Sequence, residues 1–401
     1  MSTHCANCTH GCMADPHIAG RMARIQPFHV MDLLARARRL EAMGRSIIHM
    51  EIGEPDFATP RPVVEAAQRA LDEENIHYTP AAGLQTLRSA IAAFYRRQFD
   101  LEIDPQRILV TPGSSGALQL VLNVLVDPGE RVLMADPGYP CNRHFVILAG
   151  GEPVGIPVGA ESGYQMTPGH VQQNWARKSR AVMLASPSNP TGTLVPEESL
   201  RAIHAFVREQ KGALIVDEIY QNLVYDRSPV TSLSLGDDLF VISSFSKYFG
   251  MTGWRLGWVV APEAYVEALD RLAQNIFLSA PTLSQHAALA AFDARTRQIL
   301  EARRTEFQAR RDYLLPALRE LGFGIPVEPE GAFYLYADCS AFGMPSGELT
   351  GRLLEESGVA VTPGHDFGHN AADRYLRFAY TTSMENLKEG VARIRRLLTP
   401  S

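Results

Sequence analysis

The sequence has few cysteines and no long apolar run, and each absence excludes a class of protein. Five cysteines among 401 residues are an odd number and do not make a disulfide framework in so long a chain. No stretch approaches the roughly 20 consecutive apolar residues of a transmembrane helix. The first residues, MSTHCANCTHGCMADPH, are polar and lack the apolar core of a secretory signal. We therefore expect a cytoplasmic protein that does not enter a membrane.

The chain also lacks a long run of like charge. Its formal net charge is -6, and a mildly acidic balance argues against a nucleic-acid partner, which usually requires a basic face. We expect neither nucleic-acid binding nor a charged interaction tail.

Three of the cysteines, Cys5, Cys8 and Cys12, lie in the first dozen residues beside two histidines, His4 and His10. Thiolates and imidazoles so close together are ligands that zinc accepts. A single short cluster without a second ligand pair elsewhere is weak support for a metal site, so we expect no metal. The zinc alternative stays open beside the expected disordered leader at residues 1–19.

Beyond residue 45, short apolar runs alternate with amphipathic stretches, a pattern typical of a mostly parallel sheet covered by helices. The fold class is therefore α/β, with a large domain built on a mixed sheet of about seven strands. The expected strands are residues 108–111, 131–135, 153–157, 181–185, 213–217, 240–244 and 256–260. The main helices expected between them are residues 115–126, 197–210 and 263–272.

The pattern changes after Thr282, where a long charged helical region over residues 296–321 begins a smaller α+β unit. That unit is expected to contain strands near residues 333–337 and 375–379 and a final helix at residues 384–398. A helix at residues 30–43 is expected to pack on it. The predicted division is a leader at 1–19, a lid and helix at 20–48, a large domain at 49–292 and a small domain at 293–401.

Lys247 lies in the run Ser243-Ser244-Phe245-Ser246-Lys247-Tyr248-Phe249-Gly250-Met251-Thr252-Gly253-Trp254-Arg255. One lysine stands among small hydroxyl residues, with an arginine eight positions later. A phosphorylated aldehyde cofactor needs such a set: an amine for the aldehyde, and hydroxyls with a guanidinium for the phosphate. A surface turn joining two strands is the alternative interpretation.

Polar and aromatic residues follow four other expected strands. Because ligands bind at the carboxyl ends of strands in open α/β sheets, these motifs are expected to meet at one edge. The Gly/Ser turn before a helix offers free N–H groups to a phosphate. Taken singly, each motif also suits a helix cap, a turn or a core aromatic. The four motifs are Pro112-Gly113-Ser114-Ser115-Gly116, Asp136-Pro137-Gly138-Tyr139-Pro140, Ser186-Pro187-Ser188-Asn189-Pro190-Thr191-Gly192 and Asp217-Glu218-Ile219-Tyr220.

From about residue 25 to its end, the chain resembles the class I aminotransferases of the fold type I pyridoxal-phosphate enzymes. The resemblance is carried by the turn Asn189-Pro190-Thr191-Gly192, the pair Asp217 and Tyr220, the signature from Lys247 to Arg255, and the late Arg377. It implies a pyridoxal-phosphate-dependent aminotransferase (EC 2.6.1.-) whose large domain, residues 49–292, binds the cofactor. The reaction implied is ping-pong transfer of an amino group between an L-α-amino acid and a 2-oxo acid.

The resemblance also implies a role for each residue around the cofactor. Lys247 is expected to attach to the cofactor aldehyde and then move a proton from the substrate α-carbon. Asp217 is expected to pair with the pyridinium nitrogen, Asn189 and Tyr220 to hydrogen-bond the ring oxygen, and Tyr139 to stack on the ring. The catalytic set is thus Lys247, Asp217 and Tyr220. The residues expected around the phosphate are Ser114, Ser115, Ser244, Ser246, Arg255 and, from the neighbouring subunit of a homodimer with shared sites, Tyr78.

On the substrate side, Arg377 is expected to grip the α-carboxylate, because a planar guanidinium binds a carboxylate bidentately. Gly53 is expected to let the backbone approach the same carboxylate, and Asn189 also contributes to substrate binding. The segment Ile25–Met31 resembles the N-terminal lid that closes over the site and excludes water.

The chain departs from dicarboxylate-specific relatives at residues 275–282, Asn-Ile-Phe-Leu-Ser-Ala-Pro-Thr, where it has no arginine. A neutral or apolar side chain is therefore expected on one substrate, with 2-oxoglutarate or pyruvate as acceptor.

Other pyridoxal-phosphate enzymes of this fold remain alternatives, above all a C–S β-lyase, together with cyclopropane-forming synthases and decarboxylases. Two further alternatives, a DNA-binding regulator and an inactive scaffold, fit poorly. Only some 45 residues precede the first strand-like segment, and Lys247, Asp217 and Arg377 are all present.

Overall fold

The computed structural model describes residues 17–27 and 29–398. The predicted leader with Cys5, Cys8 and Cys12 lies almost wholly outside these residues, so neither interpretation of it is tested. In the part of the chain that is described, no helix is both long enough and apolar enough to cross a membrane.

The central sheet contains seven strands in the order β2-β8-β7-β6-β5-β3-β4. Strand β8 is antiparallel to both of its neighbours, β2 and β7, and the other neighbouring pairs are parallel. The predicted α/β fold with a mostly parallel, mixed sheet is therefore confirmed. Its strands are β2 (Ile108–Thr111), β3 (Arg131–Asp136), β4 (Glu152–Pro157), β5 (Ser179–Ala185), β6 (Ala213–Asp217), β7 (Phe240–Ser244) and β8 (Gly257–Val260).

Helices cover both faces of this sheet, and each face has its own apolar core. Along β6, Leu214 and Val216 join the core on one face, whereas Ala213 and Ile215 join the core on the other. This alternation follows from the two-residue period of a strand, and it explains why the strand reads as one continuous apolar run. The helices are α4 (Gly113–Leu125), α5 (Pro140–Leu148) and α8 (Glu263–Ile276) on one face, and α3 (Gln85–Phe99), α6 (Pro168–Asn174) and α7 (Glu197–Glu209) on the other.

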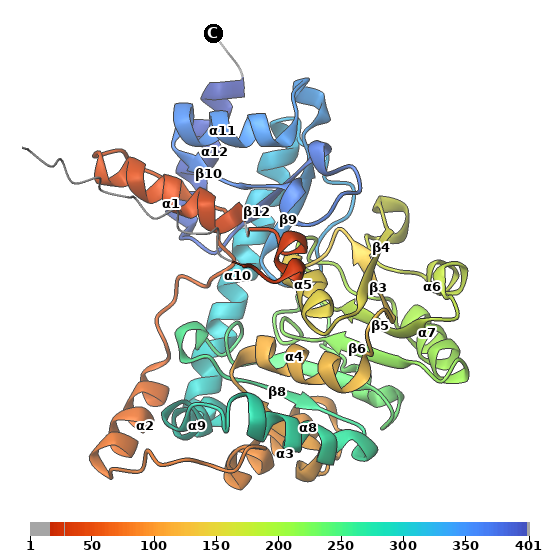
Figure 1. Ribbon diagram of the computed structural model, residues 1–401. Helices are drawn as coiled ribbons and strands as arrows, with labels where there is room; N and C mark the ends of the chain where they lie inside the picture. The colour runs from red at the N-terminus through yellow and green to blue at the C-terminus, as the bar shows by residue number, and fades with distance from the viewer. Residues whose placement is uncertain (1–16, 28, 399–401) are drawn as a thin grey trace, which may run out of the picture.

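A second unit is built on the C-terminal region and the N-terminal helix. The antiparallel strands β11 (Thr362–Pro363), β12 (Tyr375–Ala379) and β9 (Tyr334–Asp338) form one small sheet. A separate parallel pair joins β1 (Ile48–His49) to β10 (Val359–Ala360). Helices α1 (His29–Ala42), α11 (Ser346–Ser357) and α12 (Met384–Leu398) pack around them, and α1 contacts β10 and β11 (Figure 1). The exact domain boundaries stay a prediction.

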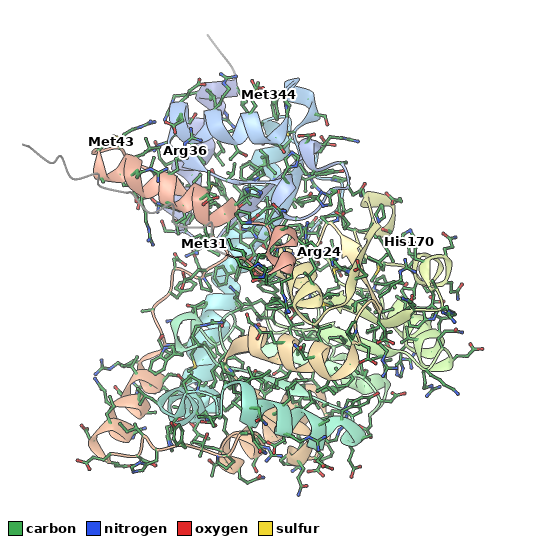
Figure 2. All side chains as sticks on the ribbon, in the orientation of Figure 1. Arg24, Met31, Arg36, Met43, His170 and Met344 are labelled. Atoms are coloured by element: carbon green, nitrogen blue, oxygen red, sulfur yellow. The ribbon has the colours of Figure 1, made fainter. Side chains whose placement is uncertain are left out.

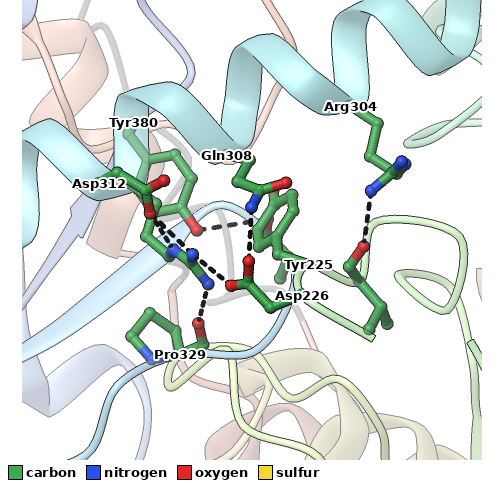
Figure 3. Close-up of polar contacts among 10 residues, drawn as sticks. Tyr225, Asp226, Arg304, Gln308, Asp312, Pro329 and Tyr380 are labelled. Atoms are coloured by element: carbon green, nitrogen blue, oxygen red, sulfur yellow. Dashed lines mark hydrogen bonds and ion pairs between the residues drawn. The ribbon is translucent and has the colours of Figure 1, made fainter. Parts of the chain in front are cut away.

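The long helix α10 (Ala294–Glu320) connects the two units. It runs from the part that holds α2 (Arg61–Asp72) and α9 (Thr282–Leu289) to the part that holds α12 (Figure 1). Side chains of α10 hold the segment that follows β6: Gln308 Nε2 donates to Asp226 Oδ1 at 2.6 Å, and Arg304 donates to a backbone carbonyl (Figure 3). These contacts tie α10 to the segment that follows β6.

Candidate active site

Five polar motifs meet at one edge of the central sheet. Strands β2, β3, β5, β6 and β7 run in the same direction, because β8 is antiparallel to both β2 and β7. The loops after these five strands therefore leave the same edge, as the sequence predicted. A pocket opens there, and its walls include eight of the predicted residues: Gly53, Ser114, Tyr139, Asn189, Asp217, Tyr220, Lys247 and Arg377.

The amine of Lys247 points into this pocket. Its Nζ donates a hydrogen bond to the carbonyl oxygen of Gly53 at 2.6 Å. Burial is the main cause that lowers the pKa of Lys247 to about 8, and the positive charges of Arg377 and Arg255 act in the same direction. The negative charges of Glu54 and Asp217 oppose them. A lysine in this state is partly neutral near pH 8, as an amine nucleophile or base requires.

Asp217 ends β6 and is buried beside the lysine. Its Oδ1 accepts a hydrogen bond from the backbone N–H of Ile219 at 3.1 Å, which orients the carboxylate after the strand. Burial raises the pKa of Asp217 to about 6, while this hydrogen bond and the charge of Lys247 lower it. A cationic group placed beside this buried carboxylate, such as a protonated ring nitrogen, would stabilise its ionised form.

Arg377 is buried on β12 and is held by neutral partners. Its Nη1 donates to Asn189 Oδ1 at 2.9 Å, and its Nη2 donates to the backbone carbonyl of Glu51. Its Nε is buried without a hydrogen-bond partner. No carboxylate of the described residues forms an ion pair with it, so its positive charge is available to an anionic ligand.

Tyr220 and Tyr334 form a buried pair in the wall of the pocket. Their hydroxyl oxygens lie 2.9 Å apart, and burial raises the pKa of both phenols. Tyr334 comes from β9 in the second unit and was not predicted from the sequence. A methyl group at Gly53 would lie 1.9 Å from its hydroxyl oxygen, so the glycine is required where the tyrosine meets the segment that holds Lys247. The run Ala332-Phe333-Tyr334-Leu335 reads as an ordinary apolar strand, and it carries no signal of this contact.

A cup of hydrogen-bond donors forms where α4 begins. A methyl group at Gly113, the first residue of α4, would lie 2.5 Å from Arg255 Nη2, so the guanidinium lies against the start of the helix. Arg255 Nη1 also lies 3.5 Å from Ser246 Oγ. The backbone N–H of Ser246 donates to Ser244 Oγ at 3.0 Å, which ties the two serines together.

Ser114 and Ser115 follow Gly113 in the first turn of α4, and Ser114 reaches the pocket wall. An arginine, serine hydroxyls and a helix N-terminus are the donors that bind a phosphate dianion. The predicted phosphate residues of one chain are therefore brought together.

Tyr78 is the predicted residue that the fold keeps away from the pocket. It is 85% exposed and lines a separate surface groove beside Thr79 and Leu278. This position agrees with the expectation that it serves a second copy of the chain, and no contact within one chain tests that expectation.

The predicted lid segment reaches the site from the N-terminal side. Val30 and Met31, at the start of α1, line the pocket, whereas Phe28 is outside the described residues. Two contacts hold the segment: Arg24 pairs with Glu152 at 2.9 Å, and the backbone N–H of His29 donates to Asp366. Figure 2 labels Arg24 and Met31 close to the N-terminal end of α1.

Comparisons with known proteins agree with this geometry. Residues 45–394 match the model of the family described as aminotransferase class I and II. The chain is 37% identical over 384 residues to a (5-formylfuran-3-yl)methyl phosphate transaminase of Methanocaldococcus jannaschii, covering 95% of this chain and 99% of the relative. It is also 37% identical over 375 residues to a valine–pyruvate aminotransferase of Mycobacterium tuberculosis, covering 93% and 96%.

A solved structure of an aminotransferase from Mycobacterium tuberculosis superposes with a TM-score of 0.92 at 36% identity, covering 96% of this chain and 99% of that one. The match to the family model, residues 45–394, extends through both units and includes every strand that contributes to the pocket. The chain therefore belongs to the class I and II aminotransferases and is a pyridoxal-phosphate-dependent aminotransferase of fold type I.

Proposed function

We propose that this enzyme moves the amino group of an L-α-amino acid with a neutral side chain to 2-oxoglutarate or pyruvate by a ping-pong cycle. The observation that carries the proposal is the buried guanidinium of Arg377, whose Nε has no partner and whose other nitrogens donate to neutral oxygens. A carboxylate on the substrate supplies the missing negative charge and accepts two parallel hydrogen bonds.

The donor set of the pocket fits the family's cofactor. When bound, pyridoxal phosphate supplies an aldehyde for covalent attachment and a ring that takes up electron density from the substrate. In our proposal Arg255, Ser244, Ser246, Ser114 and Ser115 bind its phosphate. Asp217 ends β6 in the pocket wall and pairs with the protonated ring nitrogen, because an adjacent positive charge favours the ionised form of a buried carboxylate.

The remaining polar residues orient the substrate and move its proton. Lys247 Nζ takes the α-proton as a neutral amine, a state that the lowered pKa makes accessible near neutral pH. Asn189 and Tyr220 donate hydrogen bonds to the ring oxygen, and Tyr139 packs on the ring face. Gly53 brings backbone close to the carboxylate held by Arg377.

The lid segment completes the substrate pocket. Val30 and Met31 supply apolar surface to its wall. Closure of the segment over a bound substrate excludes water from the reacting carbon, which protects a carbanion from premature protonation.

We further propose a cytoplasmic homodimer in which Tyr78 reaches the partner's phosphate cup. Apolar side chains gather around Tyr78 on the surface: Leu278 is 58% exposed, Ile76 53% and Ile276 46%. The two segments that carry them are joined, because Thr282 Oγ1 donates to the carbonyl of His77 at 2.7 Å. Such a patch beside an uncommitted tyrosine favours a second copy of the chain as the partner.

The reaction is tested by adding single L-amino acids to the purified holoenzyme in the absence of any 2-oxo acid. We expect the visible absorbance band of the bound cofactor to convert to that of its amine form, with one equivalent of the matching 2-oxo acid released. Amino acids with neutral side chains should include fast substrates. Persistence of the band while ammonia and pyruvate accumulate would instead identify a β-lyase.

The lowered pKa of Lys247 predicts a pH dependence for cofactor capture. The neutral amine is the nucleophile, so the rate at which cofactor-free enzyme captures pyridoxal phosphate should rise with pH and reach half its maximum near pH 8. Stopped-flow absorbance measures this rate, and Lys247→Ala, which lacks the amine, should show no covalent capture. A midpoint near the usual lysine value of 10.5 would contradict the proposed environment.

The role of Arg377 predicts the effect of a conservative change. Arg377→Lys keeps the charge but loses the bidentate geometry, so kcat/KM should fall by about tenfold or more, mainly through a higher KM. Steady-state kinetics with the best amino acid measure the change. Arg374→Lys, at an exposed arginine near the start of the same strand, is the matched control and should change kcat/KM less than about twofold.

The proposed interface predicts that Leu278→Glu weakens dimer formation, because a buried unpaired carboxylate is unfavourable at an apolar contact. Light scattering of the variant should report a monomer at concentrations where the wild type is a dimer. Val230→Glu changes a 47% exposed residue outside this patch and should remain dimeric. Loss of the dimer in both variants, or in neither, would argue against this location of the interface.

A further inference from the structure

The carbonyl oxygen that accepts from Lys247 belongs to a residue without a side chain. Gly53 O lies 2.6 Å from Lys247 Nζ. Glycine has the freest backbone of all residues, so contacts of its neighbours must fix its orientation. On the N-terminal side, Thr381 Oγ1 donates to the carbonyl of Ile52 at 2.8 Å. The orientation of this acceptor therefore depends also on the residues that follow it.

Helix α10 holds the residues after Gly53 through an arginine. Arg310 is 3% exposed, and its Nη1 and Nη2 donate to Asp56 Oδ1 and Oδ2 at 2.8 and 3.1 Å. Two parallel hydrogen bonds to one carboxylate fix both its position and its orientation. The Nε of Arg310 donates to Glu306 Oε1, one turn earlier in the helix, at 3.0 Å. The guanidinium is thus itself held in place, and it anchors Asp56 to the helix.

The ring of Phe57 packs on the same face of α10. Arg303, Phe307 and Arg310 are spaced by four and three residues, so they share one face of the helix. Cζ of Arg303 and Cζ of Arg310 each lie 5.0 Å from the centroid of the Phe57 ring. The ring of Phe307 meets that of Phe57 edge-on, with 5.3 Å between the centroids. Contacts of both kinds are favourable, so a second residue of the segment is anchored to α10.

The loop that carries Lys247 contacts the same helix. The hydroxyl of Tyr248 donates to Glu301 Oε1 at 2.6 Å. The loop and the segment are also joined directly, because Thr59 Oγ1 donates to the carbonyl of Gly250 at 3.1 Å. Helix α10 therefore contacts both the loop of the amine and the segment of its acceptor.

We propose that Arg310 is a positioning residue for Lys247, because through Asp56 and Phe57 it fixes the carbonyl of Gly53 that orients the amine. Arg310 does not line the pocket, so it acts only through this segment. The inference rests on the proposed function, since it assumes that Lys247 attaches to the cofactor and then moves the substrate proton.

The substrate handle has support that does not involve Arg310. The carbonyl of Glu51 accepts from Arg377, and it also accepts from Thr362 Oγ1 at 3.0 Å. Both donors belong to the small antiparallel sheet of the second unit. Loss of the contact between Arg310 and Asp56 should therefore disturb the amine more than the carboxylate site. This difference separates a positioning role from a general loss of structure.

The first measurement mixes the Arg310→Met holoenzyme with a good amino-acid substrate in the absence of any 2-oxo acid. The saturating rate of this half-reaction should fall by about tenfold, because a displaced base transfers a proton more slowly. The half-saturating concentration should change by less than about twofold, because the contacts of Arg377 are retained. Stopped-flow absorbance gives both values.

The second measurement does not depend on turnover. Attachment joins the amine nitrogen of Lys247 to the aldehyde carbon of pyridoxal phosphate and releases the aldehyde oxygen as water. Capture by the cofactor-free Arg310→Met enzyme should be slowed by about tenfold. Pyridoxine phosphate has an alcohol in place of the aldehyde and cannot attach. The affinity for it should stay within about twofold of the wild-type value, because the phosphate donors are unchanged.

Asp56→Asn tests the same contact without the loss of a buried side chain. The amide oxygen can accept only one of the two hydrogen bonds from Arg310, so capture should slow in this variant also. The double variant should be no slower than Arg310→Met, because both changes remove one interaction. Multiplied effects of the two changes would contradict a shared role.

Arg107→Met is the matched control. Arg107 is 8% exposed and pairs with Asp237, but it directly precedes β2 and thus lies at the end of that strand away from the pocket. This variant should lose thermal stability and leave the capture rate unchanged.

Three outcomes would each overturn the role of Arg310. These are an unchanged capture rate in Arg310→Met, an equal loss of capture rate and of pyridoxine phosphate affinity, and equal slowing in Arg107→Met. A wild type that captures pyridoxal phosphate no better than Lys247→Ala would instead overturn the proposed function.

Discussion

Two cations of the active site, Arg377 and Lys247, are held by the backbone of one short segment, residues 51–53. The carbonyl of Glu51 accepts from Arg377, and that of Gly53 accepts from Lys247 at 2.6 Å. Between them the carbonyl of Ile52 accepts from Thr381 at 2.8 Å, which fixes the segment to the C-terminal unit. Carbonyl oxygens orient the two cations without neutralising them, so their charges remain available to a substrate and a cofactor.

The charge balance of the pocket follows from that arrangement. Burial and the neighbouring arginines leave the pKa of Lys247 near 8, while burial raises that of Asp217 to about 6. The one buried carboxylate of the segment, Glu51, is occupied elsewhere: its Oε1 pairs with His49 Nδ1 at 2.7 Å, and this contact raises the pKa of His49 to about 9. His49 therefore stays charged at neutral pH, and Glu51 is paired with it rather than with Arg377.

Local sequence was sufficient to predict the central sheet and most of the pocket. The strand that ends in Asp217 is apolar on both faces, which identifies a covered parallel strand without knowledge of its neighbours. Each motif directly follows such a strand, and the direction rule for α/β sheets then places the motifs at one edge. The run from Lys247 to Arg255 lies within one loop, so the residues proposed to bind the phosphate could be identified there from the sequence alone.

The sequence by itself determined the chemistry available at the sheet edge, because residue type and strand order are local properties. Only the tertiary structure decided what the second unit adds. Tyr334 meets Tyr220 across 114 positions of sequence, and Gly53 is required because that tyrosine leaves no space for a side chain. Such contacts depend on how two separately built units pack. The periods of strands and helices decide which side chains share one face of an element, but they do not encode how one unit packs on another.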